Sequence, residues 1–124
     1  MKVAMMQPTF LPWQGYFELI YQADTFIFLD DFQFSIQSFH QRNKLFVNRD
    51  QVDWYTVPVQ KSKNFGLKLN ETVFDESRNW RRKFFTRLEQ NYSKTPFFYD
   101  IYPFINELLN EEKNTLSSLN IRLV

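Results

Sequence analysis

The chain has 124 residues, 44% of them hydrophobic and 23% charged, and a formal net charge of +1. These values are typical of one soluble globular domain with a real core, and the near-zero charge gives no overall attraction to nucleic acid or to an anionic membrane. Because the chain has no cysteine and one histidine, the composition excludes a disulfide framework, a thiolate nucleophile and metal sites built from several Cys or His ligands.

The sequence predicts a cytoplasmic, soluble protein without a membrane span. No run approaches the roughly 20 apolar residues of a membrane span, and Pro8 interrupts the start before a signal peptide can form. The aromatic content of 19% is high for a small domain. It indicates either a Phe-rich core or rings that line a pocket for a flat or sugar-like ligand.

The first thirty residues predict a βαβ unit. An apolar run over residues 2–6 predicts a short buried strand, and Pro8 and Pro12 predict a rigid turn after it. Residues 14–22 have the pattern of a helix, and residues 25–29 that of a second strand. Strand, turn, helix and strand in so short a stretch indicate that the two strands are parallel.

The middle of the chain predicts short strands and then one clear helix. Residues 45–47 and 52–59 have strand patterns, with a further short strand over residues 67–69. Apolar residues spaced by four predict a helix over residues 77–92; they are Trp80, Phe84, Leu88 and Tyr92.

The last thirty residues predict further helices. Thr95 and Pro96 have the pattern of an N-cap and a first helical residue, and a helix from there must bend or restart at Pro103. Residues 104–110 and 112–120 complete a helical C-terminal half. The fold class is therefore α/β, a Rossmann-like βαβ half followed by a helical half. Residues 1–124 are expected to form one partial domain whose uncovered apolar faces self-associate or are covered by a further segment.

Polar side chains gather around the ends of the two predicted N-terminal strands. In alternating strand and helix proteins, ligands usually bind at strand ends. Asp30 can bind a sugar hydroxyl, serve as a base or cap a turn, and His40 can be a catalyst or a hydrogen-bonded structural residue. The cluster consists of Gln7, Asp30, Asp31, Gln33, His40, Arg42 and Asn43.

The predicted helix over residues 77–92 also carries basic residues. Arg81 lies on its apolar side, so the guanidinium either reaches out to solvent or faces an anionic ligand group. The remaining cations of this helix are expected to form a solvated face; they are Arg78, Arg82, Lys83 and Arg87.

Several motifs in fixed order resemble the WbqC-like protein family. They are Gln7 to Phe17 (QPTFLPWQGYF), Phe28 to Phe34 (FLDDFQF), Gln41-Arg42-Asn43 and Trp54 to Val59 (WYTVPV). The resemblance implies a bacterial protein that accompanies genes for surface polysaccharide, especially the O-antigen of lipopolysaccharide. By this resemblance, the residues that match the family pattern are Gln7, Pro8, Pro12, Trp13, Gly15, Tyr16, Asp30, Gln33, Arg42 and Asn43.

Residues and resemblance together lead to the hypothesis of a transferase that acts on a nucleotide-linked or amino sugar. Asp30 and His40 are the candidate catalytic residues. Candidate substrate-binding residues are Gln7, Trp13, Gly15, Tyr16, Gln33, Arg42 and Asn43, with Arg42 on a phosphate or carboxylate. The sequence identifies no cofactor and no metal-ligand spacing.

Two alternatives stay open at this point. The first is a non-catalytic module that binds a sugar or a nucleotide. The second is an RNA-binding protein, against which the near-neutral charge argues. It would use cations interleaved with aromatic residues, namely Phe39, Arg42, Lys44, Phe46 and Arg49.

Overall fold

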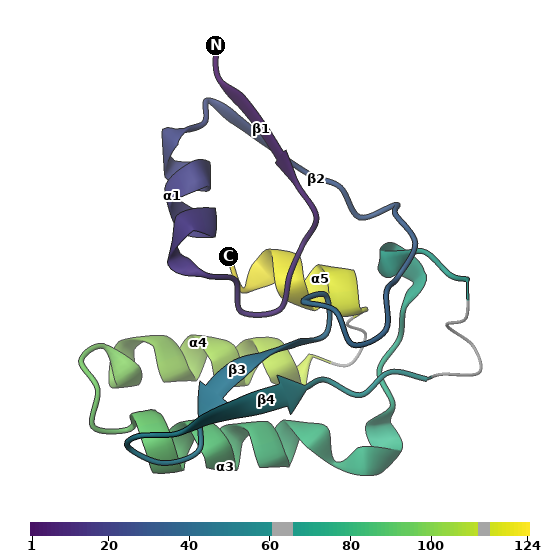
Figure 1. Cartoon of the computed structure of the whole chain (residues 1–124). Coiled ribbons are helices and arrows are strands. Elements are labelled where there is room, and N and C mark those ends of the chain that lie inside the picture. The colour runs from purple at the N-terminus through teal and green to yellow at the C-terminus, as the bar shows by residue number, and fades with distance from the viewer. Residues whose placement is uncertain (61–65, 112–114) are drawn as a thin grey trace.

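The N-terminal unit of the chain is a parallel βαβ unit, as predicted. The computed structural model describes residues 1–60, 66–111 and 115–124. In it, β1 (Val3–Met6) pairs in parallel with β2 (Thr25–Phe28), and α1 (Gln14–Gln22) connects them. Tyr16 of α1 packs on Phe26 with ring centroids 5.6 Å apart. Figure 1 shows that this unit stands above the rest of the molecule.

A β-hairpin follows the loop after β2. Its strands, β3 (Arg42–Phe46) and β4 (Val52–Thr56), are antiparallel, with Lys44 opposite Trp54. The connection is ordered by Asn48, whose side-chain oxygen accepts the N–H groups of Asp50 and Gln51 at 3.0 and 2.9 Å. The strand predicted over residues 45–47 begins earlier in the structure, at Arg42, and ends at Phe46. The strand predicted over residues 52–59 ends sooner, at Thr56.

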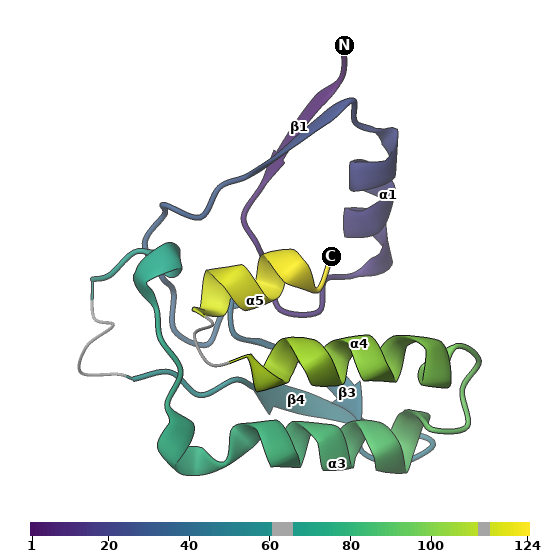
Figure 2. The ribbon, with the colours of Figure 1, turned by 180° about the vertical axis from the view of Figure 1, so that it is seen from behind.

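The remaining described elements are helical. Two 3₁₀ turns, η1 (Leu69–Glu71) and η2 (Glu76–Arg78), precede three α-helices. Of these, α3 (Trp80–Tyr92) and α4 (Phe98–Asn110) lie side by side and antiparallel, and α5 (Leu116–Arg122) lies between them and the βαβ unit (Figure 2). The α/β architecture with a helical C-terminal half is thereby confirmed. No helix among the described residues is long and apolar enough to cross a membrane.

Other predictions of helix and strand positions were wrong. Residues 67–69 form no strand; Lys68 makes one bridge to Gln33, and η1 begins at the next residue. The helix predicted over 77–92 is split, because Asn79 adopts a left-handed conformation with φ of 48°. Thr95 does not cap α4; its hydroxyl donates to the carbonyl of Tyr92 at the end of α3.

Pro103 lies inside α4 and does not break it. A proline removes the bond to the carbonyl four residues earlier, here that of Tyr99. Tyr99 is 76% exposed, so this part of the helix lies at the surface, and the helix continues through the proline to Asn110. The helix predicted over residues 112–120 begins at Leu116, and residues 112–114 lie outside the described part of the chain.

The core lies between the hairpin and the helices, and it takes up many of the aromatic rings. Phe84 of α3 has its ring centroid 5.7 Å from that of Phe10 and 5.1 Å from that of Tyr55. These contacts support a Phe-rich core. Phe39 and Phe46 remain exposed on the hairpin side, so not every ring is used in the interior.

Candidate functional site

The turn after β1 is held by a hydrogen-bond network that joins three of the predicted site residues. The hydroxyl of Tyr16 donates to the backbone carbonyl of Gln7 at 3.0 Å. The side-chain oxygen of Gln7 lies 2.7 Å from Nε2 of His40. Because the N–H of Ser35 donates to Nδ1 of His40 at 3.4 Å, Nδ1 is the acceptor and Nε2 carries the proton that Gln7 accepts.

His40 is neutral in this network. It is only 7% exposed, and burial lowers the pKa of its imidazole below the ordinary value of 6.5. Burial also raises the pKa of Tyr16 to about 12, so its phenol stays a donor. Both ring nitrogens of His40 are occupied, and in this arrangement the residue orients Gln7 and the loop that contains Ser35.

Two asparagines tie the turn to distant parts of the chain. The amide of Asn43 donates to the carbonyl of Leu11 at 2.6 Å, where the backbone has a positive φ of 48°. Asn120, on α5 and fully buried, donates to the carbonyl of His40 at 2.8 Å and to that of Pro8 at 3.4 Å. Asn120 was not among the residues predicted from the sequence, although a polar residue within an apolar helical stripe was a signal for it.

Asp30 and Gln33 lie beyond the end of β2 and contact other partners. The Asp30 carboxylate accepts a hydrogen bond from the Ser117 hydroxyl of α5 at 3.0 Å, and its backbone carbonyl accepts from Asn70. Gln33 bridges to Lys68. Within the described residues, no hydrogen bond joins Asp30 or Gln33 to the network around Gln7.

Trp13 and Gly15 form one unit at the start of α1. The Trp13 ring lies over Gly15, since a Cβ built at residue 15 would be 1.6 Å from Cζ3 of the indole. Gly15 therefore permits this close contact. Trp13 remains 68% exposed, so its other face is open for stacking.

A basic–aromatic platform, formed by Phe39, Arg42, Lys44 and Trp54, covers the outer face of the hairpin. The Arg42 guanidinium carbon lies 4.2 Å from the centroid of the Trp54 ring, and the Lys44 ammonium lies 5.4 Å from it. Phe39 packs against the same indole with ring centroids 5.7 Å apart. Strand pairing explains the cluster, because Lys44 is directly opposite Trp54 and Arg42 lies two residues along the same face.

The cations of the platform have unused hydrogen-bonding capacity. Neither Arg42 nor Lys44 forms an ion pair with any described residue. The Nε atom of Arg42 is buried and has no hydrogen-bond partner. A guanidinium held over an indole and without an anionic partner is well suited to bind a phosphate or carboxylate.

The comparison with known families agrees with the motifs at the turn and the hairpin. A model of the WbqC-like protein family matches residues 7–124. The chain belongs to the WbqC-like family. It is 38% identical over 124 residues to a Mycobacterium tuberculosis protein described as uncharacterized, Rv1507c. The alignment covers 99% of this chain and 53% of the relative, so the chain spans about half the length of this curated relative. No solved structure matches the chain.

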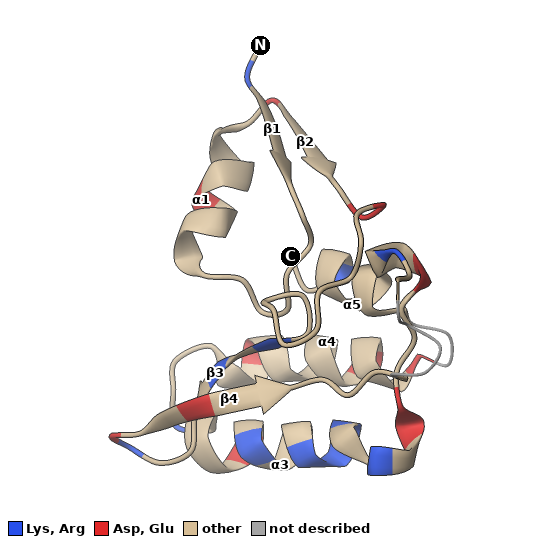
Figure 3. Cartoon of the chain, turned by 45° about the vertical axis from the view of Figure 1, so that its right-hand side comes forward, with Lys and Arg blue, Asp and Glu red and all other residues tan. Residues whose placement is uncertain are grey.

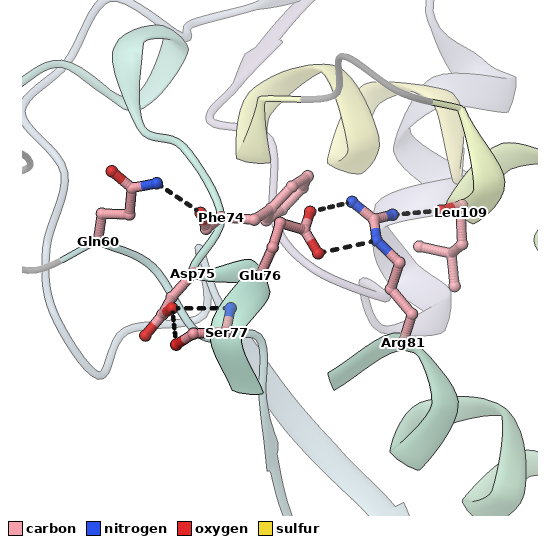
Figure 4. Close-up of polar contacts among 7 residues, drawn as sticks. All are labelled: Gln60, Phe74, Asp75, Glu76, Ser77, Arg81 and Leu109. Carbon is pink, nitrogen blue, oxygen red and sulfur yellow. Dashed lines mark hydrogen bonds and ion pairs between the residues drawn. The ribbon is translucent and has the colours of Figure 1, made fainter. Parts of the chain in front are cut away.

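Arg81 of this WbqC-like chain has a structural role. Figure 4 shows its guanidinium facing the carboxylate of Glu76, with Nε 3.2 Å from Oε2, while Nη1 donates to the carbonyl of Leu109 on α4. The same view shows the start of η2, where Asp75 accepts the N–H of Ser77 at 3.1 Å. The alternative in which Arg81 faces a ligand has no support in this arrangement, because its donors are in use.

The basic residues are concentrated in one part of the sequence. Residues 40–94 contain twelve of the fifteen Lys and Arg residues and six of the fourteen Asp and Glu residues. Figure 3 shows several of these cations along α3 and others on β3. Arg87 links α3 to the hairpin, since its guanidinium donates to the Trp54 carbonyl of β4 at 3.5 Å. A net charge of +1 thus conceals a strongly basic region.

Proposed function

We propose that this chain binds a nucleotide-linked sugar used in the assembly of bacterial surface polysaccharide, such as the O-antigen of lipopolysaccharide. The observation that supports the proposal is Arg42, stacked on Trp54 and without an anionic partner. A sugar nucleotide carries a diphosphate between two flat or ring-shaped groups. The platform offers the matching chemistry, with two cations for the diphosphate and exposed aromatic surface for a base or sugar.

The group-transfer step belongs to the same proposal, as an activity of the longer family proteins. Asp30 and His40 are its acid–base residues. Asp30 is half-buried and its carboxylate accepts one hydrogen bond, from Ser117, so lone pairs remain for a sugar hydroxyl. His40 becomes available to substrate when Gln7 releases Nε2. Opening of the turn around Gln7 would expose the imidazole of His40, a residue that is 7% exposed in this structure.

Titration calorimetry with a panel of nucleoside-diphosphate sugars tests the proposal. At least one should bind, and Arg42→Ala should weaken binding by about tenfold or more, as expected for loss of a charge-assisted contact. The same substitution should lower the free energy of unfolding by only about 1 kcal/mol, the value of a surface cation–π contact. Arg78→Ala is the matched control, because Arg78 is exposed and paired with Asp75, and it should leave binding unchanged.

Absence of binding by every sugar nucleotide in the panel would contradict the proposal. Unchanged affinity in Arg42→Ala would contradict the assignment of the platform. A large loss of stability with unaltered affinity would show that Arg42 is structural.

A second candidate function is binding of single-stranded RNA. The observation in its favour is the concentration of cations over residues 40–94, with Arg82 and Lys83 of α3 in no ion pair among the described residues. Such binding should weaken steeply with salt, and it should also weaken in Arg82→Ala and Lys83→Ala. Binding of a sugar nucleotide at the platform should not respond to the α3 substitutions. Fluorescence anisotropy with an oligouridine separates the two candidates.

A further inference from the structure

The small parallel sheet of this chain is covered on one face only. Tyr16 of α1 packs against Phe26, and the alternate residues on both strands point to the opposite side. There Val3 and Met5 of β1 are 45% and 58% exposed, and Ile27 of β2 is 41% exposed. We call these three residues the open face. Figures 1 and 2 show no described helix or strand against it.

Both edges of the same sheet are also free. Within residues 1–60, 66–111 and 115–124, β1 and β2 pair with each other and with no other strand. Purely parallel sheets occur almost only where both faces are covered, and two strands alone are marginal in water. A partner that supplies a strand to an edge and an apolar layer to the open face would complete the unit.

A second copy of the chain supplies only one of these two contacts. In a two-fold dimer that pairs strand edges, the axis is perpendicular to the sheet, and both open faces remain in water. In a two-fold dimer that packs the open faces together, the strand edges remain unpaired. A partner with a different surface can cover the face and an edge at once.

The curated relative indicates where such a partner is found. This chain aligns along nearly its whole length with 53% of that protein, so the relative contains almost as much sequence again. We propose that the part of the longer WbqC-like proteins that this chain does not span packs on the open face and adds a strand to the β1–β2 sheet. The open face carries no charged side chain, which fits an apolar helix of that second part.

Hydrogen exchange of this chain and of the complete mycobacterial relative tests the inference. The amides of β1 and β2 should exchange quickly in the chain alone. The matching amides should exchange at least about tenfold more slowly in the relative, because the added cover must open first. The hairpin β3–β4 is the internal control, and its exchange should be similar in both proteins.

A chimera that joins this chain to the part of the relative beyond the alignment provides the causal test. Met5→Lys and Ile27→Lys should remove the added protection of β1 and β2 in the chimera. Val52→Lys, at an equally exposed position on the hairpin (50%), should leave it intact. Protection of the hairpin amides in each variant shows that loss of protection at the sheet is local and not global unfolding.

Two results would overturn the inference. One is a chimera and a relative whose β1–β2 amides exchange as quickly as those of the chain alone. The other is a chain that sediments as a dimer and becomes monomeric in Met5→Lys, because a second copy would then occupy the open face.

Discussion

Replacing Asn120 with alanine should cost about 2–3 kcal/mol of unfolding free energy. Its side chain is fully buried and donates to the carbonyls of His40 at 2.8 Å and Pro8 at 3.4 Å. The substitution removes one well-formed hydrogen bond, worth about 1 kcal/mol, and leaves a buried carbonyl unpaired at about 1–3 kcal/mol. The Oδ1 atom of Asn120 has no partner, so its loss adds no further cost. The expected loss of unfolding free energy therefore stays at the lower end of the sum of the two contributions.

Urea unfolding followed by circular dichroism measures this effect, and calorimetry should show a fall in Tm of roughly 10 °C. Asn106→Ala is the matched control on α4. Its contact with Asn110 is exposed, so a change below about 0.5 kcal/mol is expected. Asn120→Asp should be worse than alanine at neutral pH, because a carboxylate would face two carbonyl oxygens. A loss below about 0.5 kcal/mol in Asn120→Ala would refute the view that α5 is tied to the site by this residue.

The other predictions concern three positions. Burial lowers the pKa of His40 in the folded chain, so the unfolded chain binds the proton more readily. The free energy of unfolding should therefore fall as the pH drops below about 6.5. The slope should be at most about 1.4 kcal/mol per pH unit until the folded pKa is passed. His40→Asn should flatten that slope, and an unchanged slope in urea titrations across pH would assign it to other groups. Arg81→Met should cost about 1–2 kcal/mol, because it leaves the Leu109 carbonyl without its donor; Glu76→Gln should cost less, since Glu76 is 57% exposed. Gly15→Ala should displace the exposed Trp13 ring, which would move the indole N–H signal in NMR spectra. The free energy of unfolding should stay within about 1 kcal/mol of that of the parent. An unmoved signal would contradict the contact between Trp13 and Gly15.

The N-terminal half was predictable because its signals are local. Helix α1 has the predicted bounds of residues 14–22, since Pro12 and the apolar periodicity that follows define its start. Strand β3 was placed too late because it begins with Arg42 and Asn43, polar residues that join the strand only through pairing with β4. The course of α4 through Pro103 was not predictable, because a proline within a helical pattern predicts a bend or a restart there.

The candidate site was predictable where its residues surround one turn. Gln7, Tyr16 and His40 meet as the strand-end argument suggested. Their assignment to ligand binding stays a prediction, because each also has a structural hydrogen bond. The contributions of α5 were not predictable, since Asn120 lies 80 residues from His40 in sequence. Trp54 became part of the site only through the hairpin register, which composition alone does not specify.

The most direct test of the proposed platform follows the side-chain N–H signals of Arg42 and Trp54 in ¹H–¹⁵N spectra during titration with nucleoside-diphosphate sugars. The Nε–H of Arg42 is buried and has no hydrogen-bond partner, so its signal should be observable, and a phosphate bound by the same guanidinium should shift it. If the platform binds a sugar nucleotide, both signals should move together and saturate with that ligand. Signals that stay fixed up to about 1 mM ligand, a concentration that detects even weak binding, would contradict the proposed platform.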